Sequence, residues 1–343
     1  MRKLGVILLS IMLVFTVLGC GKSGTSTETK GAETQSTPAQ PIKIKVGCDN
    51  TSGGPWDQGF KEFMRLVEQK APGRIQFQYY PDGQLSNNDQ RVTMEMLQTG
   101  SIHIAALLPS IYEQFDRRWQ IYGMPYLFKT TEEARASCDG EAGKYMLSLL
   151  EEKGIHGLAL WEQGWRHLTT SKKPVRLPPD IKGMKIRVMD SPSFIEMMKE
   201  LGALPLVTSM GELYTALQQG AADGQENPLT TIYRRKLYEA QDYLTLTRHV
   251  YNPLIIGANK KFYDSLPADI QKVLTEAALE TVAFERKAND NEDTKFLAEL
   301  KKELEVIELT DADINQWKEA TKNILPKFKD TIGQDVLGKF GIK

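Results

Sequence analysis

The sequence predicts an α/β protein built as two lobes, and three observations support this. Strand-like and helical patterns alternate from residue 42 onward, which is typical of α/β folds. A helix-end pattern at 97–103 (LQTGSIH) returns 120 residues later at 217–223 (LQQGAAD), as two similar units would produce. Removal of a 19-residue leader would leave 324 residues, enough for two domains of about 150 residues each.

Composition excludes several classes of protein. The hydrophobic fraction is 41% and the net charge is −1, or −3 once Arg2 and Lys3 are lost with the leader. These values exclude a polytopic membrane protein, a fully disordered chain and a collagen-like fibre. A balanced charge provides no global field for nucleic acid, so any anion site must depend on a few placed cations. Three cysteines are too few for a disulfide scaffold or a zinc cluster.

The N-terminus predicts export and a lipid anchor. A basic start precedes an uncharged run over 4–19, which is shorter than the roughly 20 residues of a bilayer-spanning helix and typical of a signal-peptide core. The run ends in 17–20 (VLGC), which resembles a bacterial lipoprotein signal with Cys20 as the lipidated first residue. The alternative, an uncleaved N-terminal anchor, would also place the rest of the chain outside the cytoplasm.

A flexible tether is predicted over 20–41, after the signal peptide at 1–19. Its residues after Cys20 are rich in Ser, Thr and Gly and almost free of apolar side chains, so they cannot bury a core. A coil of this length reaches about 25 Å. The globular part is therefore expected to begin near Ile42.

The first elements follow from periodicity. Ile42, Ile44 and Val46 alternate with lysines and predict a half-buried strand. Apolar residues then recur at helical spacing over 60–67, and 74–80 alternates again before a Pro-Asp-Gly turn. A second helix is expected at about 88–98, and a short strand at about 102–107.

The two similar units predict where a ligand would lie. Each ends a helical pattern with a glycine, Gly100 or Gly220, at a position that favours a left-handed C-cap before the next strand. Two unrelated helix-to-strand joints could share this solution. Two α/β lobes would instead place strand ends and helix N-termini at a common crevice, the usual ligand position.

A long charged helix is expected at about 268–304, where neither Pro nor Gly occurs. At 1.5 Å per residue it would be about 55 Å long. That length exceeds one domain, so the helix is either broken or braces both lobes.

No motif points to catalysis, a metal or a cofactor. The four histidines include no pair with zinc-ligand spacing, and no nucleophile elbow, Cys-x-x-Cys pair or dinucleotide fingerprint occurs. Absence of known motifs does not exclude an enzyme, but nothing in the sequence calls for catalysis, and the chain is expected not to be an enzyme.

Six blocks, taken in order, carry a resemblance to a known family. They are 124–128 (MPYLF), 164–169 (GWRHLT), 182–188 (KGMKIRV), 202–205 (GALP), 212–220 (ELYTALQQG) and 223–228 (DGQENP). Together they resemble the solute-binding protein of a tripartite ATP-independent periplasmic (TRAP) transporter, of the DctP type, over about 42–330.

The resemblance implies a carboxylate site. Arg187, in the Lys-Ile-Arg strand, corresponds to the family's ligand-binding arginine; Arg166 and Asn227 correspond to a second arginine and an asparagine at the ligand. Guanidinium offers a fixed fork for two carboxylate oxygens, and Asn offers both donors and an acceptor. From pattern alone, Arg187 could be a solvated strand residue, Arg166 could pair with a local carboxylate, and Asn227 could shape the turn before Pro228.

The resemblance also indicates further pocket positions. Asp190 and Met210 fall near pocket positions of related proteins, and Asp49 and Asn87 could add polar contacts from the first lobe. At 107–110 the chain has Leu-Leu-Pro-Ser where some sialic-acid-binding relatives have Glu-Ser, which disfavours sialic acid.

The family implies an extracytoplasmic, monomeric binding protein that delivers a dicarboxylate or a uronate-like sugar acid to TRAP membrane subunits. The expected lobes are 42–164 plus 254–292, and 165–253 plus 293–343. An extracytoplasmic lyase or hydrolase acting on organic acids, and a binding protein that feeds a sensor, remain alternatives. Whether Cys48 and Cys138 pair is left open.

Overall fold

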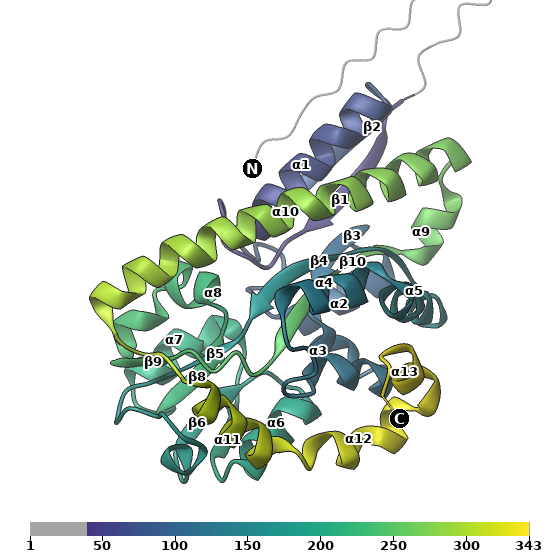
Figure 1. Cartoon of the computed structure of the whole chain (residues 1–343). Helices are drawn as coiled ribbons and strands as arrows, with labels where there is room; N and C mark the ends of the chain where they lie inside the picture. Colours follow the sequence, from purple (N-terminus) through teal and green to yellow (C-terminus); the bar gives the residue numbers. More distant parts are fainter. Residues whose placement is uncertain (1–39, 343) are drawn as a thin grey trace, which may run out of the picture. The chain divides into compact units, whose positions relative to one another are not determined.

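The computed structural model describes residues 40–342, which contain two β-sheets with helices packed around them (Figure 1). The predicted signal peptide, Cys20 and the tether up to residue 39 lie outside the described residues; residues 40 and 41 are exposed and precede β1. Each sheet is the centre of one lobe, named here the first and the second lobe. The predicted two-lobed α/β fold is therefore confirmed.

The first sheet has the strand order β2-β1-β3-β10-β4. Its strands are β1 (Ile42–Gly47), β2 (Ile75–Tyr80), β3 (Ile104–Leu107), β4 (Ile155–Trp165) and β10 (Tyr251–Asn259). β1 is parallel to β2 and β3, whereas β10 is antiparallel to β3 and β4. The alternation at the start of β1 arises because Ile44 and Val46 are fully buried while Lys43 and Lys45 face solvent.

Helical segments of both kinds belong to the first lobe. The α-helices are α1 (Pro55–Lys70), α2 (Gln90–Thr99), α3 (Pro109–Tyr112), α4 (Thr131–Asp139), α5 (Glu141–Ser148) and α9 (Lys260–Ser265). The 3-10 helices are η1 (Arg117–Gly123) and η2 (Leu149–Lys153). The predicted helix at 88–98 corresponds to α2, and the predicted strand at 102–107 to β3.

The second sheet has the order β11-β9-β5-β8-β6-β7. Its strands are β5 (His167–Thr170), β6 (Lys185–Val188), β7 (Leu204–Val207), β8 (Gly224–Asn227), β9 (Tyr243–Thr245) and β11 (Glu305–Ile307). Around it lie η3 (Pro178–Ile181), α6 (Pro192–Glu200), α7 (Met210–Gln218), α8 (Leu229–Arg234), η4 (Leu237–Ala240) and α11 (Asp311–Thr321).

The two sheets contain the same supersecondary unit. β1-α1-β2-α2-β3 forms a parallel trio in the order β2-β1-β3, and β6-α6-β7-α7-β8 forms one in the order β7-β6-β8. Gly100 follows α2 with φ 77°, and Gly220 follows α7 with φ 68°, so both joints use the left-handed region that glycine favours. The motif noticed in the sequence therefore marks equivalent positions in two similar units.

The chain passes between the sheets more than once. β4 ends at Trp165 and β5 begins at His167, so the first crossing occurs at Arg166. The chain returns between β9 and β10, over residues 246–250, and crosses again along α10. Helices α12 (Ile324–Ile332) and α13 (Gln334–Lys339) then pack against η1 and α5 of the first lobe, and α12 also contacts α6. Which residues move together as one lobe stays a prediction.

Helix α10 (Ala268–Glu303) is a single helix of 36 residues, about 54 Å long at 1.5 Å per residue. It runs beside α1 and β4 and continues to α8, η4 and β11, so it braces both lobes (Figure 1). Its buried face is apolar at Leu274 and Leu300 but polar in the middle, at Glu285 and Asn289. No helix within residues 40–342 combines the length and apolar character that crossing a bilayer requires.

Cys48 and Cys138 are both buried and free, and no disulfide joins them. Burial raises the pKa of each thiol to about 12, which makes both poor nucleophiles at neutral pH. The question left open by the sequence is thereby answered: the cysteines serve as small apolar side chains.

Candidate functional site: a cavity between the lobes

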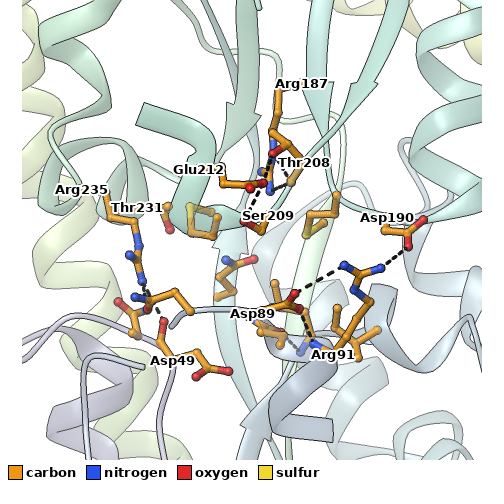
Figure 2. Close-up of a pocket in the computed structure, with 18 of the residues that line it drawn as sticks. Asp49, Asp89, Arg91, Arg187, Asp190, Thr208, Ser209, Glu212, Thr231 and Arg235 are labelled. Atoms are coloured by element: carbon orange, nitrogen blue, oxygen red, sulfur yellow. Dashed lines mark hydrogen bonds and ion pairs between the residues drawn. The ribbon is translucent and has the colours of Figure 1, made fainter. Parts of the chain in front are cut away.

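A cavity of about 420 Å³ lies where strand ends from both sheets meet. The segments after β1 and β3 line it from the first lobe, and those after β6 and β7 from the second. This is the crevice at the carboxyl ends of parallel strands that the fold class predicts. Figure 2 shows Arg187, Thr208 and Ser209 on one side, with Asp49, Asp89 and Arg91 opposite.

Arg187 lies in β6 and is only 2% exposed. Ile186 and Val188, its neighbours in the strand, are fully buried, and the arginine faces the cavity from the other side of the strand. Its Nε and Nη2 donate to the carbonyl oxygen of Thr208, at 3.0 and 2.7 Å. The third nitrogen, Nη1, is buried and has no hydrogen-bond partner among the described residues.

The charge on Arg187 is only partly compensated. The pKa of its guanidinium is lowered to about 10, mainly because the group is buried. The nearby negative charge of Glu226 opposes this shift, and the positive charge of Arg166 adds to it. The group is still cationic at neutral pH. A buried cation with an unused donor is costly unless an anion accepts from it, so this arrangement suits a carboxylate.

Arg166 lies behind the cavity and is fully buried. It pairs with Glu226 of β8 through Nε and Nη2, and Nη2 lies 3.0 Å from Glu226 Oε1. Its Nη1 donates to Gln163 Oε1 at 3.0 Å, so all three nitrogens have partners within the protein. His249 Nε2 lies 3.2 Å from the other carboxylate oxygen of Glu226.

The carboxylate of Glu226 is held in its charged form. Burial raises its pKa, but the charge of Arg166 and hydrogen bonds from His249 and Arg166 outweigh burial, and the net shift is downward. The alternative of a carboxylate partner for Arg166 therefore exists in the structure. Arg166 is not among the residues that line the cavity, and a direct ligand contact for it stays a prediction.

Asn227 belongs to the same buried network. Its Oδ1 accepts from Arg166 Nη2 at 3.0 Å, and its Nδ2 donates to Gln225 Oε1 at 2.5 Å. It is fully buried and does not line the cavity. Gln163, which accepts from Arg166, does line the cavity and so connects this network to it.

Asp49 lines the cavity from the first lobe, immediately after β1 and Cys48. Its two carboxylate oxygens accept from Ser86 Oγ at 2.5 Å and Thr93 Oγ1 at 2.6 Å. Burial raises the pKa of this carboxyl, although the two hydroxyls and the charge of Arg235 oppose the shift.

Asp190 and Met210 both line the cavity. Asp190 accepts from Arg91 of α2 at 3.2 Å, so this ion pair crosses from the second lobe to the first (Figure 2). The Arg91 side chain also forms an ion pair with Asp89. Asp89 caps α2, because its carboxylate accepts a hydrogen bond from the backbone NH of Arg91 at 2.9 Å. Asn87 is exposed, does not line the cavity, and lies against Gly211.

Sequence reasoning missed Arg235, Arg91 and Gln163, which also line the cavity. Arg235 follows α8 and donates to Asn88 Oδ1 at 2.7 Å and to the Asp49 carbonyl at 2.8 Å, across the two lobes. The only sequence signal for Arg235 was a pair of arginines at the end of a helical pattern. Such a pair is also expected without any ligand, because positive side chains near a helix C-terminus interact favourably with the helix dipole.

Across residues 40–342, no three His, Cys, Asp or Glu side chains converge as a metal-binding group. The cavity instead combines arginines, of which Arg187 and Arg235 have no carboxylate hydrogen-bond partner among residues 40–342, with amides, hydroxyls and carboxylates. Such a lining can hold and orient a polar anion, which is the chemistry of binding.

Comparison with known proteins agrees with this geometry. Residues 47–331 match the family model DctP, described as bacterial extracellular solute-binding protein, family 7. The chain belongs to this family. It is 32% identical to the C4-dicarboxylate-binding periplasmic protein DctP of Rhodobacter capsulatus, with 87% of this chain and 90% of the relative covered.

Two solved structures are also similar to this chain. The sugar acid binding protein DctPAm of Advenella mimigardefordensis, in complex with galactonate, is 32% identical with a TM-score of 0.84, covering 88% of this chain and 97% of its own. A TRAP periplasmic solute-binding protein of Sulfurospirillum deleyianum, with bound succinate, is 31% identical with a TM-score of 0.82, covering 88% and 98%. The chain is thus an extracytoplasmic solute-binding protein of the TRAP class.

Proposed function

We propose that the chain captures a small organic acid, a dicarboxylate or a uronate-like sugar acid, by its carboxylate and delivers it to the integral membrane subunits of a TRAP transporter. The observation that carries the proposal concerns Arg187, which lines the cavity: its Nη1 is a buried donor that has no partner among residues 40–342. The relatives named above bind such acids.

Closure of the lobes on the ligand supplies the signal that the membrane subunits would recognise. A ligand that contacts both walls of the cavity binds the closed state more tightly than the open one, which is the only way it can shift the population. Arg187 offers contacts from the second lobe and Asp49 from the first. We infer that the protein acts as a monomer.

A thermal-shift screen with organic and sugar acids tests the proposal. At 100 times its dissociation constant, the correct acid should add about 2.7 kcal/mol to the free energy of unfolding. Mass spectrometry before and after incubation should recover the acid unchanged. Failure of every acid to raise the melting temperature would refute the proposed capture of an organic acid. Accumulation of a product would favour the alternative, an extracytoplasmic enzyme that acts on organic acids.

We also propose that Cys20 carries the lipid that tethers the protein to the membrane. Cys20→Ala should abolish lipid attachment and release or misprocess the protein, because the thiol is the acceptor. Fractionation and mass measurement of the mature N-terminus check this. A Cys20→Ala protein that still sediments with membranes and is processed like the wild type rules out the anchor.

A further inference from the structure

We propose that Glu113 is a proton-controlled contact between the two lobes, which favours the closed form, and with it ligand binding, at acidic pH. Glu113 does not line the cavity, so this inference goes beyond the capture of an acid. It follows from the contacts that Glu113 makes across the lobes and from the charge that it would bring there.

Helix α3 and the residues after it, in the first lobe, contact the segment between β6 and α6 in the second. Ser110 Oγ donates to Met189 Sδ at 3.4 Å, and Gln114 Nε2 donates to the carbonyl oxygen of Asp190 at 2.9 Å. Met189 and Asp190 also line the cavity. This strip of contacts therefore joins the lobes beside the cavity, and opening of the lobes would break it.

Glu113 lies within this strip and is only 2% exposed. Its Oε2 accepts from Ser191 Oγ and its Oε1 from Ser193 Oγ, both at 2.9 Å, and both serines are fully buried at the start of α6. A methyl group added at Gly123 of η1 would lie 2.0 Å from Ser193 Oγ and 3.2 Å from Glu113 Oε1, so η1 closes the contact on that side. The carboxyl group is thus enclosed by parts of both lobes.

The ionised form of Glu113 has weak support in this enclosure. No Lys, Arg or His within residues 40–342 forms an ion pair with it, and the backbone NH of Ser193 is 3.4 Å from Oε2, a long hydrogen bond. A buried carboxylate without a cation is costly, whereas a neutral carboxylic acid needs only ordinary hydrogen bonds. Serine hydroxyls both donate and accept, so Ser191 and Ser193 can bond to either form. The contact therefore accommodates both forms of Glu113 but favours the protonated one.

The titration of Glu113 agrees with this geometry. Burial raises the pKa of its carboxyl to about 7, and the hydrogen bonds from Ser191 and Ser193 oppose the shift, to which no charged group within residues 40–342 contributes. Tyr112 and Tyr122 are buried, which raises the pKa of both phenols and keeps them neutral. Charged side chains on the neighbouring elements pair with one another or are exposed: Asp116 pairs with Arg118, Asp190 with Arg91, Glu196 and Glu200 with Lys327, and Arg117 and Lys199 are exposed.

Proton binding is thereby linked to closure of the lobes. In an open form, with Glu113 in water, the pKa of its carboxyl returns to its ordinary value of about 4.5. Between about pH 4.5 and about pH 7, closure then takes up a proton, and each pH unit upward weakens the closed form by up to about tenfold. Below this interval both forms are protonated and above it both are ionised, so closure no longer depends on pH through Glu113.

Calorimetry in buffers of different ionisation enthalpy measures this proton. With galactonate or succinate as the probe, whichever binds, the wild-type protein at about pH 6 should take up about 0.9 proton more than Glu113→Gln, which cannot titrate. The affinity of the wild type should fall by about twentyfold between about pH 5.5 and about pH 7.5, and that of Glu113→Gln by less than about threefold. Glu141→Gln is the matched control, because Glu141 is an exposed glutamate of the first lobe and this variant should respond like the wild type.

Ser193→Ala distinguishes a titrating contact from a packing contact. The change removes a donor that stabilises the ionised form, so the pKa of Glu113 should rise and the affinity should fall at a higher pH than in the wild type. A contact that acts through packing alone would leave the pH of this fall unchanged.

Spin labels at Glu95→Cys in α2 and Gln219→Cys after α7 test the ligand-free protein, because both positions are exposed, whereas Cys48 and Cys138 are buried. The distance between the labels should lengthen from about pH 5.5 to about pH 7.5, and Glu113→Gln should abolish this change. Equal responses of the wild type and Glu113→Gln, or no response of either, would overturn the inference. If neither acid binds, capture of these acids fails, and the label distance still decides the role of Glu113. If Glu113→Gln does not fold, Ser193→Ala decides in the same measurements.

Discussion

Arg187→Ala should weaken binding of the captured acid by roughly thirtyfold to several-thousandfold. The substitution leaves a desolvated carboxylate without its charged partner, which costs about 2–5 kcal/mol, and about 1.4 kcal/mol corresponds to each tenfold change. Two of the three guanidinium nitrogens donate to the Thr208 carbonyl, and the third, Nη1, has no hydrogen-bond partner among residues 40–342. Folding should survive, since the side chain faces the cavity.

Arg187→Lys separates charge from geometry. Lysine keeps the positive charge but has only one side-chain nitrogen. It cannot donate to the Thr208 carbonyl with two nitrogens and to the ligand with a third, so it should restore only part of the affinity. Arg176→Ala is a matched control, because Arg176 pairs with Asp313 on the surface and does not line the cavity. Calorimetry with circular dichroism checks these results. Binding of Arg187→Ala within about threefold of the wild type would mean that Arg187 does not hold the carboxylate.

Arg166→Ala should lower the free energy of unfolding by about 3–5 kcal/mol, because it leaves the buried carboxylate of Glu226 without its main charge partner. His249, 3.2 Å from Glu226, can compensate only in part. The double variant Arg166→Met with Glu226→Met should cost less than the sum of the single changes, since no buried charge is then left unpaired.

Urea denaturation and calorimetry distinguish a structural from a ligand-binding Arg166. If Arg166 acts only through the buried network with Glu226 and Gln163, Arg166→Ala should lower the free energy of unfolding. Ligand affinity should then fall only indirectly, because Gln163 and the adjoining strand are displaced. A variant of normal stability that has lost binding would show that Arg166 contacts the ligand directly. Additive effects in the double variant would contradict the buried pair.

Local patterns predicted much of the fold. The alternation at Ile42, Ile44 and Val46 identified β1, and the absence of Pro and Gly over 268–303 identified α10. Strands of three or four residues, such as β5, β9 and β11, are too short to show a period. The antiparallel insertion of β10 between β3 and β4 is a pairing over long sequence separations, which no local pattern encodes.

The residues of the candidate site could be predicted where they lie in or near the sequence blocks that resemble the family. Arg187, Asp190 and Met210 do line the cavity, and Asp49 lies opposite. Arg166 and Asn227 occupy a buried layer behind, because Glu226, 60 residues from Arg166 in the chain, becomes its neighbour only when β5 and β8 pair. Arg235 could not be found from sequence, since its contacts are with Asn88, 147 residues away.

The position of β10 also determines when the strands of the first sheet can all pair as the chain emerges during export. β3 and β4 are both present before residue 251, yet each keeps an open edge until β10 arrives to lie between them. The second sheet, in contrast, has every strand except its edge strand β11 once residue 245 has passed. The second sheet can therefore pair five of its six strands before β10 is present, although β11 joins it only at Glu305–Ile307. Until β10 is in place, the edges of β3 and β4 that it covers are unpaired, and an unpaired strand edge can associate with another chain.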